Sequence, residues 1–129
     1  MGTPAIVMGD KIAGMCAVHQ IPNPASGVPQ PSPAPLPFSA PLTQGLAPTV
    51  LIGSKAAAVI NSKGMNTPPH VGLHGTDPYV TPTMQVGRIL TASTTVYFEG
   101  QPAATATSQA TCCLEPGSLV PTITNVLIG

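Results

Sequence analysis

The chain has 129 residues, of which only 6% are charged, and its four basic and four acidic side chains leave no formal net charge. Because binding of nucleic acid or of an anionic membrane surface requires a basic face, neither partner is expected. The length fits one domain, and the absence of a bilayer-spanning run or a leader-like N-terminus predicts synthesis in the cytoplasm, or exit without a cleaved signal peptide.

The first segment, residues 3–53, contains a proline-rich insert over residues 22–48. The segment opens with an apolar stretch that ends in the turn signal Gly9-Asp10. The insert holds nine prolines, and proline fixes φ and lacks an N–H donor, so we expect neither helix nor central strand there. Alternating prolines over residues 29–35 favour an extended polyproline II path. We expect an ordered surface strap rather than a disordered linker, because strand-like segments flank it.

The second segment, residues 54–100, is predicted to contain three short strands and one long loop. A strand over residues 57–60 precedes the loop, which is rich in Asn, Pro and Gly and covers residues 61–87. A strand pair over residues 86–90 and 94–98 is expected to follow, joined by the small turn Thr91-Ala92-Ser93.

The third segment, residues 101–129, is the most compact. It begins with an extended stretch over residues 103–107, continues through a loop at about 112–117, and contains strands near 119–120 and 126–128. Nowhere in the chain does an apolar period of 3.6 residues persist for three turns. Short runs rich in Val, Ile and Thr between turn residues therefore predict an all-β fold with little helix.

One phrase occurs three times and divides the chain into units at about 3–53, 54–100 and 101–129. Each unit has an alanine-rich start, an irregular middle and an apolar strand that ends in glycine. The three strand copies are Val50-Leu51-Ile52, Val96-Tyr97-Phe98 and Val126-Leu127-Ile128. Repetition of this kind indicates one object made of three similar parts, arranged about a pseudo-threefold axis within a single domain.

The histidines and cysteines of the chain fall in the middles of these units. Cys16 and His19 lie in the first loop, and His70 and His74 lie in the second. Cys112 and Cys113 occupy the third loop. A pseudo-threefold axis would bring the loops to one end, where imidazole and thiolate form a tetrahedral zinc site. A metal would also stabilise a small domain with a thin core, although Cys16 is equally readable as a small buried side chain.

The sequence carries no recognisable catalytic machinery. There is no Gly-x-Ser-x-Gly elbow, no glycine-rich phosphate loop before a helix, and no pair of carboxylates for acid–base chemistry. Asp10 and Asp77 are both in turn positions. A catalytic zinc keeps an open coordination position and a nearby base, so we expect a closed structural metal in a protein that is not an enzyme.

The alanine-rich starts carry a family motif. Residues 4–10 match the pattern Pro-Ala-Ala-Arg-x-Gly-Asp, with Ile6 and Val7 in place of Ala-Arg. Residues 101–104 match a third start and residues 56–58 a degenerate second one, with Asn61-Ser62 at the Gly-Asp place. In these features the chain resembles the PAAR-repeat proteins, which form the sharp tip of contractile injection machines such as type VI secretion systems and phage-like tails. The missing arginine makes it a divergent, PAAR-like member.

The resemblance implies a small conical β-structure with a metal near its vertex, commonly held by three histidines and one cysteine. Carried over by position, the histidine ligands are His19, His70 and His74. Cys112 falls at the place of the cysteine ligand by count from Pro102, and Cys113 does so after a one-residue slip, with Cys16 in reserve. The implied metal is structural zinc, with iron as the alternative.

The resemblance also implies that one copy of the chain caps a homotrimeric β-helical spike of the VgrG or phage-baseplate type and helps it pierce an envelope. The protein would be made in the bacterial cytoplasm, become the tip of the particle, and in some systems help to load effector cargo. The residues expected to meet the spike, by continuing its strands, are the strand copies Val50, Leu51, Ile52, Val96, Tyr97, Phe98, Val126, Leu127 and Ile128. Two other interpretations stay open: a small zinc-dependent hydrolase and a self-associating structural β-protein.

Overall fold

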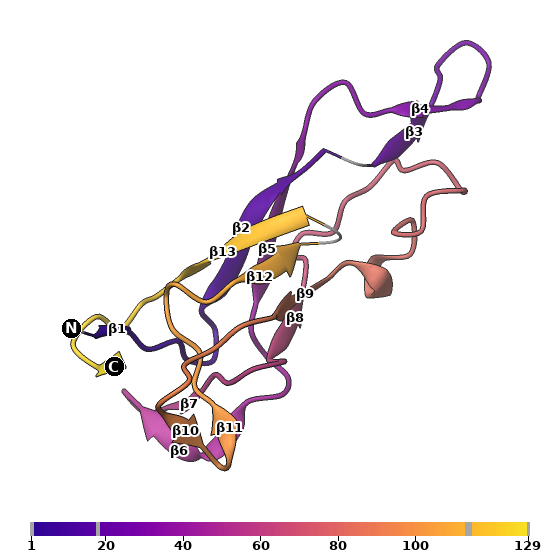
Figure 1. Ribbon diagram of the computed structural model, residues 1–129. Helices are drawn as coiled ribbons and strands as arrows, with labels where there is room; N and C mark the ends of the chain where they lie inside the picture. Colours follow the sequence, from indigo (N-terminus) through magenta and orange to yellow (C-terminus); the bar gives the residue numbers. More distant parts are fainter. Residues whose placement is uncertain (1, 18, 113–114, 129) are drawn as a thin grey trace.

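The computed structural model describes residues 2–17, 19–112 and 115–128, and it confirms the all-β expectation (Figure 1). One 3-10 turn, η1 (Pro82–Met84), is the only helical element in these residues. Within the same residues, no helix has the length and apolarity needed to cross a bilayer.

The strands are short, from two to six residues, as expected for a chain so rich in proline and glycine. In chain order they are β1 (Thr3–Pro4), β2 (Lys11–Cys16), β3 (Gln20–Pro22), β4 (Pro29–Pro31), β5 (Leu36–Pro41), β6 (Ala47–Ile52), β7 (Lys55–Ala57), β8 (Lys63–Met65), β9 (Val86–Ile89), β10 (Tyr97–Phe98), β11 (Gln101–Pro102), β12 (Ala110–Cys112), β13 (Glu115–Val120) and β14 (Leu127–Ile128). They form one larger sheet and four two-stranded pairs.

The larger sheet is antiparallel and has the strand order β5-β2-β13-β12-β9-β8. Its inner face carries the main core, which includes Ile12, Phe38 and Ile89. The two edge strands approach each other closely, and a Cβ at Gly64 of β8 would collide with the carbonyl oxygen of Pro41 in β5. This sheet forms the middle of the molecule and delivers the end of β2 to the candidate site described below.

The proline-rich insert is ordered, but its path differs from the one expected. Residues 29–31 form β4, which pairs with β3, and the chain then continues as β5. The polyproline path predicted over residues 29–35 is therefore wrong for its first part. β5 accommodates Pro37 and Pro41 because it is an edge strand, where a residue without an N–H donor breaks no ladder on the open side.

The strand pair predicted between residues 86–90 and 94–98 is also wrong. β9 pairs with β8 and β12, whereas β10 pairs with β11. The two central residues of the β10–β11 turn, Glu99 and Gly100, have φ values of 52° and 78°. Such a left-handed pair makes the tight turn whose twist suits a two-residue hairpin, so β10 turns back onto β11 rather than onto β9.

Three of the two-stranded pairs are equivalent to one another. The pairs β6–β7, β10–β11 and β1–β14 all join a strand copy to an alanine-rich start, and all lie at one end of the molecule (Figure 1). Their registers correspond: Leu51↔Ala56, Tyr97↔Pro102 and Leu127↔Pro4. The repeated phrase of the sequence thus becomes three quasi-equivalent strand pairs.

The alanine-rich starts are joined to one another in cyclic order. The joining bridges are Val7↔Ala57, Val59↔Ala103 and Ala5↔Thr105. In each start a side chain three residues on accepts the same backbone hydrogen bond. These bonds run from Val7 N to Asp10 Oδ2, Val59 N to Ser62 Oγ and Thr105 N to Ser108 Oγ, each at 3.0 Å. One set of contacts made three times gives this end of the molecule a pseudo-threefold arrangement.

Candidate metal centre

Three potential metal ligands are gathered in the interior, at the end of the sheet opposite the three strand pairs. Cys16 is the last residue of β2, His19 directly precedes β3, and His70 lies in the loop between β8 and η1. All three are buried, and their ligand atoms lie within 4.8 Å of one another. Donors bound to one tetrahedral zinc ion lie about 3.5 Å apart, because zinc–ligand bonds are about 2.0 to 2.3 Å long. Small side-chain adjustments would let all three bind one ion.

Two nitrogen atoms in this group lack a hydrogen-bond partner. They are His19 Nε2 and His70 Nε2, the two buried side-chain polar atoms in the described residues for which none is found. Leaving a buried polar atom unsatisfied costs about 1–3 kcal/mol, and such atoms mark a strained site or a place for an ion or water. Two of them beside a buried thiol fit the donor set of a borderline-soft metal such as zinc.

The other ring nitrogen of His19 faces Asp77. His19 Nδ1 lies 3.2 Å from Asp77 Oδ2, and both side chains are buried. Burial acts to raise the pKa of Asp77, but hydrogen bonds from Gln20 N, Tyr79 N and the His19 ring outweigh it and hold the pKa below its ordinary value. An ionised carboxylate only accepts hydrogen bonds, so in the neutral form of the ring the proton lies on Nδ1 and Nε2 keeps its lone pair for a metal.

His70 is held through its backbone by the fully buried Gln85. The Gln85 Oε1 atom accepts from His70 N at 2.7 Å, and Gln85 Nε2 donates to His70 O at 3.1 Å. Burial lowers the pKa of His70, and the neighbouring His19 lowers it further, while Asp77 acts in the opposite direction. The lowered pKa favours the neutral His70 imidazole, which is the form that binds a metal.

Aromatic rings enclose the site. The His19 and His70 rings meet edge to face with centroids 4.7 Å apart, and Tyr79 approaches His19 at 5.5 Å in a similar geometry. Phe38, from the main core, lies 6.2 Å from His70. A metal at this place would be screened from water, as closed structural sites are.

The structure places His74 outside this group. Its Nδ1 lies 2.8 Å from Thr76 Oγ1, and its Nε2 lies 3.1 Å from the carbonyl oxygen of Gly27. The chain turns away from the site after His70, at Gly72, whose φ is +76°. His74 therefore connects the second loop to the β3–β4 turn, and Cys16, the reserve ligand, takes a place beside the two other histidines.

The remaining predicted ligands belong to the β12–β13 hairpin. Cys112 is the last residue of β12 and pairs with Gly87 and Glu115, whereas Cys113 lies outside the described residues. The Glu115 side chain accepts a hydrogen bond from Ala17 N at 3.1 Å. This contact places Glu115, the first residue of β13, against the residue that follows Cys16.

Asp77 and Gln85 were not predicted as parts of the site. In the sequence Asp77 looks like an ordinary turn residue, and it does accept from Tyr79 N two residues on at 2.7 Å, in addition to its contact with His19. Its place three residues after His74 was the one available signal. Gln85 gave no signal, because a polar side chain that holds a distant backbone depends entirely on the tertiary fold.

The strand copies are only partly available to a partner. Leu51, Tyr97 and Leu127 are 64%, 55% and 57% exposed, whereas Ile52 and Ile128 are buried in a second core cluster at this end. The remaining four, Val50, Val96, Phe98 and Val126, are partly buried against the same cluster. Alternation along a strand explains the difference, since successive side chains point to opposite faces. Of the nine residues predicted to meet a spike, only Leu51, Tyr97 and Leu127 have largely exposed side chains.

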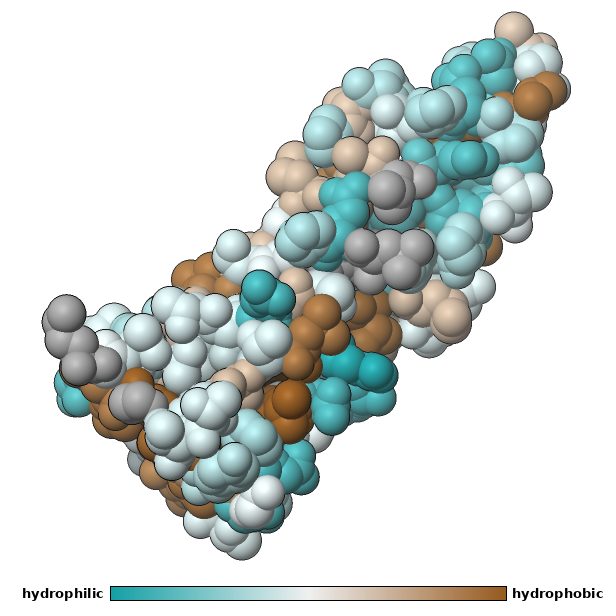
Figure 2. All heavy atoms as spheres, viewed as in Figure 1, coloured by the Kyte–Doolittle hydropathy of each residue, from teal (hydrophilic) through white to brown (hydrophobic). Residues whose placement is uncertain are grey.

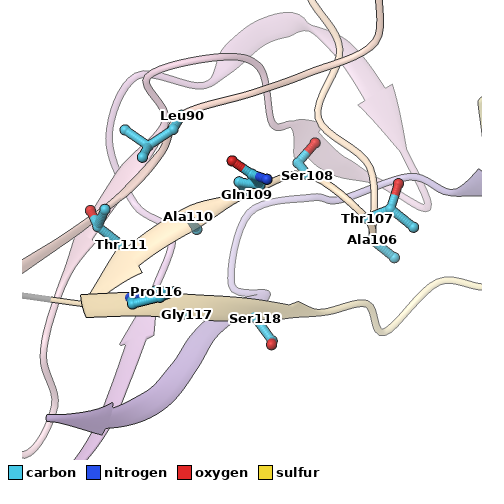
Figure 3. A pocket seen from close by; sticks show the side chains of 10 residues that line it. All are labelled: Leu90, Ala106, Thr107, Ser108, Gln109, Ala110, Thr111, Pro116, Gly117 and Ser118. Carbon is cyan, nitrogen blue, oxygen red and sulfur yellow. The ribbon is translucent and has the colours of Figure 1, made fainter.

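One pocket is separate from the metal-ligand group. It has a volume of about 650 Å³ and lies against the β12–β13 hairpin (Figure 3). Its lining consists of Leu90, Ala106, Thr107, Ser108, Gln109, Ala110, Thr111, Pro116, Gly117 and Ser118. These side chains offer hydroxyl and amide groups but no ionisable group for acid–base chemistry.

Comparison of the chain with protein-family models, with curated proteins and with solved structures finds no match.

Proposed function

We propose that this chain is a PAAR-like tip for the spike of a contractile injection machine. In this proposal the end that carries the strand pairs β6–β7, β10–β11 and β1–β14, here called the broad end, seats one copy on a homotrimeric β-helical spike. A structural metal stabilises the opposite part of the molecule. The observation that carries the proposal is the threefold set of contacts, with Leu51, Tyr97 and Leu127 exposed at corresponding register positions. Three similar faces on a single chain fit a partner that itself has three.

The broad end is suited to a symmetric trimer. Three quasi-equivalent strand pairs can each meet one subunit of a closed threefold partner. Each pair is two-stranded and so leaves backbone groups that a partner strand can extend. The chain carries only four basic and four acidic residues, so apolar contacts and backbone hydrogen bonds would dominate this interface rather than charge.

The metal would tie together segments that the short strands alone hold weakly. Cys16, His19 and His70 join the end of β2, the start of β3 and the second loop. We propose zinc as the ion, with iron as the alternative, and Cys112 or Cys113 as the source of a fourth ligand. Because its ligands are buried, the ion would have a structural role in a protein that is not an enzyme. It would stiffen the narrow end of the molecule during penetration.

The test is co-purification with a homotrimeric β-helical spike protein of the VgrG type from the same organism. We expect the wild-type chain to bind, each of Leu51→Glu, Tyr97→Glu and Leu127→Glu to weaken binding at least tenfold, and the triple variant to abolish it. Val28→Glu is the matched control, because Val28 is 58% exposed but lies in the β3–β4 turn at the other end. Failure of the wild-type chain to bind, a stable homopolymer, or unchanged binding by the triple variant would overturn the proposal.

A further inference from the structure

We propose that Asp77 is a positioning residue for the metal centre, holding the His19 ring in the tautomer and orientation that present Nε2 to the ion. The inference rests on the metal centre proposed above and adds a residue that sets its affinity. Asp77 would not touch the metal. It would act through His19, whose other nitrogen it faces at 3.2 Å.

The Asp77 carboxylate is itself held from two sides. Its Oδ2 accepts from Gln20 N at 2.9 Å, and its Oδ1 accepts from Tyr79 N at 2.7 Å. Gln20 belongs to β3 and Tyr79 to the second loop, so the carboxylate links the two segments that carry His19 and His70. Because backbone donors occupy both oxygens and the side chain is buried, the group has a fixed direction in which to receive the ring N–H.

The direction of the Asp77 carboxylate determines which ring nitrogen of His19 carries the proton and which keeps a lone pair for a metal. With the proton on Nδ1, Nε2 keeps its lone pair and has no other partner, and His19 belongs to one ligand group with Cys16 and His70. With the proton on Nε2, the same ring could not bind a metal there. Ligating histidines commonly donate their second N–H to a carboxylate for this reason.

The Asp77 carboxylate would act one imidazole away from the ion, without occupying a coordination position. His70 has a different support, because Gln85 holds its backbone rather than its ring. Loss of Asp77 is therefore expected to act through His19.

The first test compares Asp77→Asn with Asp10→Asn for zinc affinity, measured by competition with a chromogenic chelator. The Asp77→Asn change keeps the size of the side chain but removes the charge, so the oxygen that faces His19 Nδ1 and Gln20 N becomes a weaker acceptor for the ring N–H. We expect affinity to fall about 10- to 100-fold, with one ion still bound at saturation. Asp10 is the matched control, because it is also buried and accepts from Val7 N and Thr122 Oγ1, and its variant should bind zinc as the wild type does.

A second measurement separates positioning from general stability. If Asp77 is purely structural, its substitution should lower the free energy of unfolding equally in the zinc-loaded and the chelator-treated protein. If it is a positioning residue, the loss should be larger in the zinc-loaded protein. Should Asp77→Asn fail to fold, ¹⁵N shifts of the His19 ring in the metal-free wild type decide, and we expect the Nδ1–H tautomer. Wild-type affinity in Asp77→Asn, or the opposite tautomer, would overturn this inference alone. A wild-type chain that binds no zinc would overturn the metal centre itself.

Discussion

His19 and His70 are fixed by the chain in two different ways. Asp77 holds the ring of His19, whereas Gln85 holds the backbone of His70 on both its N–H and its C=O side. A ring held by a carboxylate gains a defined tautomer, and a backbone held by an amide gains a defined position. Together they hold two imidazoles, each with an unpartnered buried Nε2, in one group with the Cys16 thiol.

Substitution of the ligands should separate the true donor set from the predicted one. We expect Cys16→Ser, His19→Ala and His70→Ala to lower zinc from about one ion per chain to near zero, measured by mass spectrometry of the purified protein. At free zinc 100-fold above Kd, losing the ion removes about 2.7 kcal/mol of stability. His74→Ala is the control and should keep its zinc, because both ring nitrogens already have partners. Loss of zinc in His74→Ala, or its retention in His19→Ala, would refute this donor set.

Residue types and repeats could predict His19 and His70 as members of one site, because both fall in the middles of repeat units. They could not predict the direction in which the chain turns after His70. The predicted ligand set therefore contained His74 and kept Cys16 in reserve, whereas the observed group contains Cys16 and not His74. The left-handed conformation at Gly72 and the contact of His74 with Gly27 exist only in the folded chain. The role of Asp77 could not be predicted for a similar reason. Its carboxylate stabilises a local turn through Tyr79 N and also contacts His19, which lies 58 residues away in sequence.

At the scale of elements, β2 is the strand that the sequence concealed. Lys11–Cys16 contains one β-branched residue, Ile12, and a glycine, so its intrinsic preference for strand is low. It forms because β5 and β13 pair with it on both sides and because Ile12 and Cys16 are buried. By contrast, β9 and β14 fall where residues 86–90 and 126–128 predict them, since their apolar pattern is local.

The close approach of β5 and β8 gives a test of the sheet. We expect Gly64→Ala to lower the free energy of unfolding by about 1–3 kcal/mol, because its Cβ would collide with the Pro41 carbonyl. Gly75→Ala is the matched control, since a Cβ there meets no atom within 4 Å, and it should be neutral or stabilise by up to about 1 kcal/mol. Urea unfolding of both variants measures the difference, and equal stabilities would show that the two edges do not meet.

The whole molecule has a broad end and a narrow end (Figures 1 and 2). The three equivalent strand pairs form the broad end, and the β3–β4 hairpin extends beyond the metal-ligand group at the other. The candidate metal centre therefore lies behind the outermost hairpin, between the end of the sheet and the loops of the narrow end. The all-β class and the three similar units could be read from the sequence, because short apolar strands and a repeated phrase are local signals.

The central claim is that a chain with three similar faces serves a partner with three subunits. The most direct measurement is the mass, by native mass spectrometry, of the complex between this chain and a homotrimeric spike protein of the VgrG type from the same organism. The account predicts one copy of this chain on three spike chains, with the base variant Leu51→Glu/Tyr97→Glu/Leu127→Glu absent from the complex. Three copies on three spike chains, or a spike trimer that never acquires this chain, would contradict it.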